Sequence, residues 1–138
     1  MLVAAREIFA KHRLLLTFNG KSYDVPCLRD RCVVHRVEPA ADALAHVDIL
    51  HPARRRWGGV LPDCRLQTLE KTIVGIHRTG DVPSAEIPGV YHEFTANGDP
   101  TPLMPVLHHG RVDVLTTARV FARLATPADS GRSEGGAP

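Results

Sequence analysis

The chain contains only two segments with the character of β-strands, and this limits the folds open to it. Residues 14–18 (Leu-Leu-Leu-Thr-Phe) form a continuous apolar run, which is typical of a strand buried on both faces of a parallel sheet. Residues 47–50 form a shorter candidate, which His51-Pro52 ends. Because two strands do not make an independently stable sheet, the sequence predicts part of an α/β domain. The further strands are expected outside this chain or in a partner, and the unpaired strand edge predicts poor solubility.

The rest of the chain favours helices and turns. The spacing of apolar and turn residues predicts helices at residues 1–12, 24–36, 66–74, 83–94 and 103–124. We expect a break around Pro88 in the fourth helix, and single helical turns within residues 37–45 and at residues 53–57. Residues 126–138 are polar and rich in Gly and Pro, so a disordered tail is predicted after a domain at residues 1–125.

Composition excludes several classes of protein. The 17 Lys and Arg residues against 15 Asp and Glu give a net charge of +2, unlike a strongly basic nucleic-acid coat protein. Hydrophobic residues make up 43% and aromatic residues 5% of the chain, so a mainly aliphatic core is expected. No apolar run approaches the roughly 18 residues that span a bilayer, and charges interrupt residues 1–13, so neither a membrane span nor a signal peptide is predicted. Three cysteines without framework spacing favour reduced thiols and a cytoplasmic protein.

Polar residues follow the first predicted strand, in the segment Thr17-Phe18-Asn19-Gly20-Lys21-Ser22-Tyr23-Asp24-Val25-Pro26. Open α/β sheets bind ligands at the carboxyl ends of their strands. A structural interpretation is also open, because Asn19-Gly20 predicts a turn and Asp24 suits the cap of the following helix. The two roles are compatible, since a carboxylate at this position can also face a metal ion.

A second locus lies in the long predicted helix. His109 and Asp113 are four residues apart and therefore share one helix face. Asp113 also neighbours the apolar positions of the helix, so it is expected at the rim of the core, where a carboxylate needs a metal ion or His109 as partner. The alternative is a solvated His–Asp pair. A zinc site at Cys27, Cys32 and His35 is not favoured, because their spacing is not a standard one.

Together the two loci resemble a known family. Residues 18–26 look like the second acidic motif of the YprB-type branch of RNase H-like DEDD exonucleases. Residues 109–115 (His-Gly-Arg-Val-Asp-Val-Leu) look like its last motif, usually His-Asn-x-x-Asp-Val-Leu, with Gly110 in place of Asn. Residues 46–55, 64–70 and 87–99 continue the match in the same order. The resemblance covers roughly residues 13–124.

The resemblance implies an activity and a set of site residues. Members of this superfamily hydrolyse phosphodiester bonds with two divalent cations held by four acidic residues, and Mg²⁺ or Mn²⁺ suits such oxygen ligands. It implies metal binding by Asp24 and Asp113, with His109 orienting or deprotonating the attacking water and His108 as the alternative general base. It also implies two groups of contacts with nucleic acid. The first consists of Asn19, Lys21 and Tyr23, after the strand, and the second of Arg54, Arg55 and Arg56, in a basic turn. A solvated role for the basic turn is equally open.

The chain departs from the family in one respect that bears on activity. The first motif, a strand with Asp-x-Glu, does not occur in it, and nothing marks Asp48 or Glu70 as substitutes. We therefore expect a partial RNase H-like fold, with the last two strands and the helices but without the opening three strands, and an incomplete two-metal site. The expected function is metal-dependent 3′–5′ exonuclease-type hydrolysis of DNA or RNA by the complete domain, acting on a single-stranded end. The alternative is a non-catalytic remnant that binds nucleic acid or a protein partner covering the exposed sheet edge.

Overall fold

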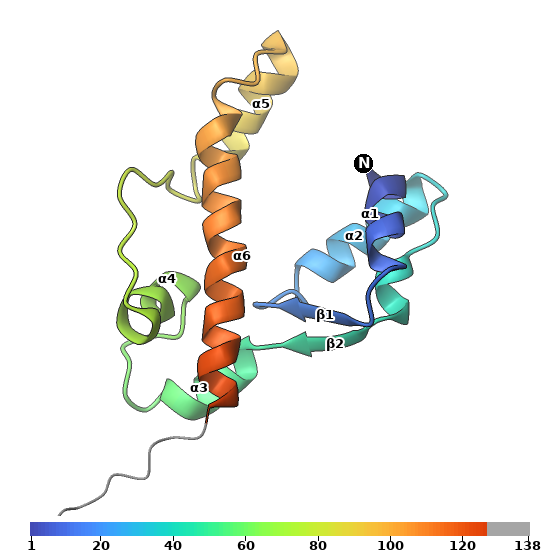
Figure 1. Cartoon of the computed structure of the whole chain (residues 1–138). Helices are drawn as coiled ribbons and strands as arrows, with labels where there is room; N and C mark the ends of the chain where they lie inside the picture. Colours follow the sequence, from blue (N-terminus) through green and yellow to red (C-terminus); the bar gives the residue numbers. More distant parts are fainter. Residues whose placement is uncertain (127–138) are drawn as a thin grey trace, which may run out of the picture.

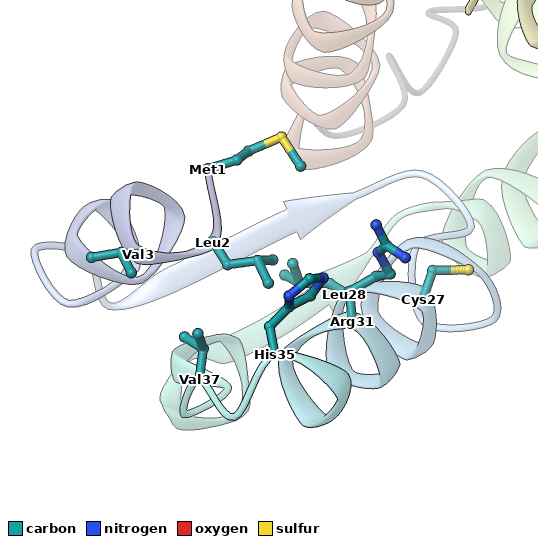
Figure 2. Close-up of a pocket in the computed structure, with 8 residues that line it drawn as sticks. All are labelled: Met1, Leu2, Val3, Cys27, Leu28, Arg31, His35 and Val37. Carbon is teal, nitrogen blue, oxygen red and sulfur yellow. The ribbon is translucent and has the colours of Figure 1, made fainter. Parts of the chain in front are cut away.

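A computed structural model describes residues 1–126 of the chain and shows the α/β class that the sequence predicts (Figure 1). The elements in chain order are α1 (Leu2–Phe9), β1 (Leu14–Thr17), α2 (Asp24–Val34), a 3₁₀ turn η1 (Ala40–Ala43), β2 (Ala45–Asp48), α3 (Leu50–Trp57), α4 (Leu66–Leu69), a π-helical turn η2 (Glu70–Val74), α5 (Ile87–Asn97) and α6 (Leu103–Ala125). Figure 1 shows α6 as a long central rod, with α1, α2 and the two strands on one side of it and α4 on the other.

The sheet consists of β1 and β2 within the described residues. The two strands run parallel, with Leu14 opposite Ala45 and Thr17 opposite Asp48. Here β1 pairs with β2 alone, so its second edge is open. The predicted strand at 47–50 is two residues too late, because Leu50 already begins α3. Pro52 lies in the first turn of α3, where a missing N–H costs nothing, so it permits a helix where we expected only a turn at 53–57.

A small aliphatic core joins the ends of the strands to α6. Ile49, which connects β2 to α3, is fully buried in one cluster with Ala53 of α3, Leu69 of α4 and Val120 of α6. Arg56 closes this arrangement, because its Nη1 donates to the carbonyl oxygens of Arg123, Leu124 and Thr126 at 2.8, 3.0 and 2.8 Å. These are the carbonyls that a helix end leaves without partners. Arg56 therefore has a structural role that the sequence did not reveal.

Two of the predicted helices differ from the structure. The helix predicted at 66–74 is an α-helical turn followed by the π-helical turn η2, and it ends at Gly75, whose φ is 78°. The helix predicted at 83–94 begins only at Ile87, because Pro88 fits the first turn and starts α5 rather than interrupting it. Residues 127–138, most of the predicted tail, lie outside the described residues. Within residues 1–126 no helix is long and apolar enough to cross a membrane.

Candidate functional site

The turn after β1 is held by Asp48, at the end of the neighbouring strand. The Asp48 Oδ1 accepts hydrogen bonds from the backbone N–H groups of Asn19 (2.9 Å) and Leu50 (3.1 Å), and Oδ2 accepts one from Lys21 (2.9 Å). Asn19 has a φ of 62°, and a Cβ on Gly20 would come within 2.5 Å of the Thr17 side chain. Burial alone raises the pKa of Asp48, but the three N–H donors outweigh it and hold that pKa below its ordinary value. Asp48 therefore anchors this turn.

Replacing Asp48 with alanine is expected to destabilise the fold by about 2–3 kcal/mol, because hydrogen bonds to a charged acceptor are worth about 1.5–3 kcal/mol each and are not additive. Urea unfolding followed by circular dichroism measures this. Asp99→Ala is the matched control, since the Asp99 carboxylate also accepts a backbone N–H, from Thr101, but on an exposed turn. Equal shifts of the two urea midpoints would contradict the anchoring role of Asp48.

Asp24 lies at the start of α2, on the far side of this turn. Asp24 is the first helical residue, Tyr23 occupies the cap position, and no side chain caps the helix. The expectation that Asp24 caps α2 is therefore wrong, because α2 begins at Asp24 itself, one residue earlier than that role requires. Its exposed carboxylate is free to face the cleft beside it.

That cleft separates β1 from α6 and has a volume of about 400 Å³. Its walls are mostly apolar, and Asp24 and Asp113 are the two acidic residues among those that line it: Leu16, Thr17, Phe18, Asp24, Leu66, Asp113, Val114, Thr117 and Ala118. The fold thus places Asp24 and Asp113, which the sequence singled out in two distant segments, on the lining of one cleft.

The Asp113 carboxylate also contacts the side chains of Arg78 and His109. The Arg78 Nη2 donates to Asp113 Oδ1 at 2.6 Å, and His109 Nε2 lies 3.3 Å from Asp113 Oδ2. The other ring nitrogen of His109, Nδ1, lies 2.8 Å from Asp81 Oδ1. His109 is therefore buried with a carboxylate at each ring nitrogen. Asp113 is more exposed, as a residue at the rim should be.

Arg78 is the centre of a larger buried cluster. Its Nε and Nη2 donate to the two oxygens of Glu70 at 2.7 and 2.8 Å, and its Nη1 donates to Asp81 at 3.0 Å. The Thr116 hydroxyl also donates to Glu70. Burial raises the pKa of Glu70, but the hydrogen bonds from Arg78 and Thr116 outweigh it and hold that pKa below its ordinary value. Chiefly through Glu70, the cluster raises the pKa of the guanidinium.

Sequence reasoning missed Arg78 and Asp81. The available signal was Glu70, which follows the apolar Leu69 on a segment that had to face the core and so required a cation. Nothing in the spacing of the chain distinguishes Arg78 from the other arginines as that cation. Arg78 and Thr116 bind the two Glu70 oxygens, so Glu70 serves to hold Arg78 in this cluster.

The structure separates the two candidate histidines. His109 contacts Asp113, whereas His108 is exposed and lines a cavity of about 210 Å³ together with His77, Arg78 and Asp81. Gly110, where the family usually has Asn, faces open space, since a Cβ there would meet nothing within 4 Å.

The residues expected to contact nucleic acid are exposed. Asn19, Lys21 and Tyr23 project from the turn that leads to Asp24, and Arg54 and Arg55 lie on α3. Unlike Arg56, these two arginines make no ion pair or side-chain hydrogen bond within residues 1–126. All five positions are therefore accessible to a ligand.

The donor set fits a divalent cation in kind but not in number. Carboxylate oxygens such as those of Asp24 and Asp113 are the ligands that Mg²⁺ and Mn²⁺ prefer. Among residues 1–126, however, no three His, Cys, Asp or Glu side chains are arranged to hold a metal ion. Asp24 and Asp113 by themselves are too few to form such a group of ligands.

Comparisons with known proteins place these features in context. A family model described as RNase_H superfamily matches residues 1–125. The uncharacterized protein YprB of Bacillus subtilis (strain 168) is 35% identical over 112 residues, which cover 80% of this chain and 27% of that protein. The chain therefore spans about a quarter of the length of this relative. No solved structure gives a significant match.

Proposed function

Since this chain belongs to the RNase H superfamily, we propose that it forms part of a nuclease domain that hydrolyses DNA or RNA from a single-stranded 3′ end with divalent cations. The observation that carries this proposal is the shared cleft of Asp24 and Asp113 between β1 and α6. Superfamily membership supports nuclease-type activity, and the cleft supplies a place for it.

Each residue near the cleft has a proposed task. Asp24 and Asp113 hold Mg²⁺ or Mn²⁺, which when bound would supply activation of the water and stabilisation of the leaving oxygen. His109 orients or deprotonates the attacking water; we prefer it to His108 because only His109 contacts Asp113. The remaining carboxylates come from a strand outside this chain, for which the open edge of β1 is a docking place.

The exposed residues around Asp24 are proposed to hold the nucleic acid. Lys21 is suited to a phosphate, Asn19 to a hydrogen bond with sugar or base, and Tyr23 to stacking on the terminal base. Arg54 and Arg55 on α3 are suited to the phosphates of the strand that leads to this end. Backbone contacts of this kind bind without reading sequence, so a broad substrate range is expected.

The proposal is tested with the full 138-residue chain and single-stranded DNA and RNA labelled at the 5′ end. We expect slow shortening from the 3′ end with Mn²⁺ and its complete loss with excess EDTA, because two of the carboxylates alone hold the ions weakly. Separation of the products on denaturing gels measures direction and rate. Shortening that persists in EDTA, or products of internal cleavage, would contradict the proposal.

A second candidate function is binding without hydrolysis, either of nucleic acid or of a protein strand along β1. The contacts of Asp113 favour binding without hydrolysis, because Arg78 and His109 already contact the two carboxylate oxygens of Asp113. Salt-dependent binding of the labelled strands without any Mn²⁺-dependent shortening at high protein concentration would select this candidate over the nuclease.

A further inference from the structure

We propose that Arg78 is the positioning residue of the candidate site, which fixes the orientation of Asp113 and, through Asp81, that of His109. The inference rests on the proposed function for the role of Asp113 as a metal ligand. The geometry itself stands on contacts within the described residues.

The first step is the rigid attachment of Arg78. Its guanidinium pairs with Glu70 through two parallel hydrogen bonds of 2.7 and 2.8 Å, the fork geometry that arginine forms with carboxylates. Glu70 is itself held by Thr116 on α6, and its side chain is only 2% exposed. The guanidinium plane is therefore fixed by groups that do not contact Asp113 or His109.

The second step is that the N–H groups of Arg78 also bind two carboxylates besides Glu70. Nη2 of the fixed guanidinium also donates to Asp113 at 2.6 Å, and Nη1 donates to Asp81 at 3.0 Å. Asp81 in turn lies 2.8 Å from the Nδ1 of His109. The Nη1 of Arg78 also lies 3.5 Å from the same His109 Nδ1. One guanidinium thus contacts the Asp113 carboxylate and, directly and through Asp81, the His109 ring.

The third step is the side of Asp113 that this leaves open. Arg78 binds Asp113 from the segment after η2, whereas Asp113 lines the cleft toward β1 and Asp24. The hydrogen bond from Arg78 to Oδ1 thus restricts the orientation of the Asp113 carboxylate beside the cleft. Hydrogen-bond partners of metal ligands act in this way, and their loss typically costs about 10–100-fold in metal affinity.

The experiment uses the full chain with ¹³C-labelled histidine and follows the ring signal of His109 by NMR, assigned by its absence in His109→Gln. In Arg78→Lys the charge remains but the fork is lost, so the His109 signal is expected to shift without metal. The Mn²⁺ concentration that broadens this signal is expected to rise about 10-fold. The matched control is Arg29→Lys, which breaks an exposed arginine fork on Asp42 and is expected to change neither measurement.

A second variant protects the test against misfolding. Glu70→Gln preserves the shape of the side chain, leaves Asp113 and His109 unchanged and weakens the attachment of Arg78. It is expected to shift the same signal and raise the Mn²⁺ requirement to a smaller extent. If neither folded variant moves the His109 signal or the Mn²⁺ requirement, the positioning role of Arg78 is overturned. If the signal moves but Mn²⁺ does not broaden it in the wild-type chain, Arg78 still positions the pair and it is the proposed metal-dependent function that fails.

Discussion

Replacing Arg78 with methionine is expected to lower the free energy of unfolding by about 3–5 kcal/mol, because removing one partner of a buried ion pair leaves an uncompensated charge in the interior. Three carboxylates depend on this guanidinium, and Glu70 has almost no contact with solvent. Native proteins are stable by about 5–15 kcal/mol, so this loss would consume a large part of the total. Urea unfolding at neutral pH, followed by circular dichroism, measures it.

A second substitution separates charge burial from loss of packing. In Arg78→Met combined with Glu70→Leu, both members of the buried pair are apolar, and replacement of a whole pair is often neutral or stabilising. The double variant is therefore expected to recover at least about half of the lost stability. Arg29→Met is the control for removal of an exposed arginine fork and is expected to have a much smaller effect. An additive loss in the double variant would show that Glu70 does not need Arg78.

Local signals predicted much of the fold. The apolar run at residues 14–18 predicted β1. The helical spacing of apolar residues over 103–124 predicted α6 almost to its ends. Two of the errors arose at prolines. Pro52 and Pro88 both fit the first turn of a helix, where proline costs nothing, whereas the prediction placed the end or break of an element at each. A proline marks a boundary, but on its own it does not say on which side of that boundary the helix lies.

Some residues of the site could be recognised from local motifs, whereas others depend on contacts between distant parts of the sequence. Asp24 and Asp113 belong to short motifs, so their residue types could be recognised, and the fold places them in one cleft. Arg78, Asp81 and Asp48 act through partners that are far away in the sequence, such as Asp113 for Arg78 and Asn19 for Asp48. Such pairs leave no periodicity or spacing in a single sequence. The one available signal was Glu70, whose expected position facing the core required a cation as its partner.

Replacing Asp113 with alanine is expected to reduce Mn²⁺-dependent hydrolysis by at least about 100-fold, which corresponds to about 2.7 kcal/mol of transition-state stabilisation. A bound divalent cation supplies several kcal/mol to such a reaction, and Asp113 is one of the two acidic residues that line the cleft within residues 1–126. The rate of 3′-end shortening, compared at equal protein concentration, measures the effect.

The contacts of Asp113 make this variant informative. Arg78 retains Glu70 and Asp81 when Asp113 is removed, so the buried charge remains paired and the fold is expected to persist. Asp99→Ala removes a carboxylate from an exposed turn outside the cleft lining and is expected to leave the rate unchanged. If Asp113→Ala is folded and hydrolyses as fast as the wild-type chain, Asp113 is not a metal ligand. The cleft between β1 and α6 would then bind without catalysing.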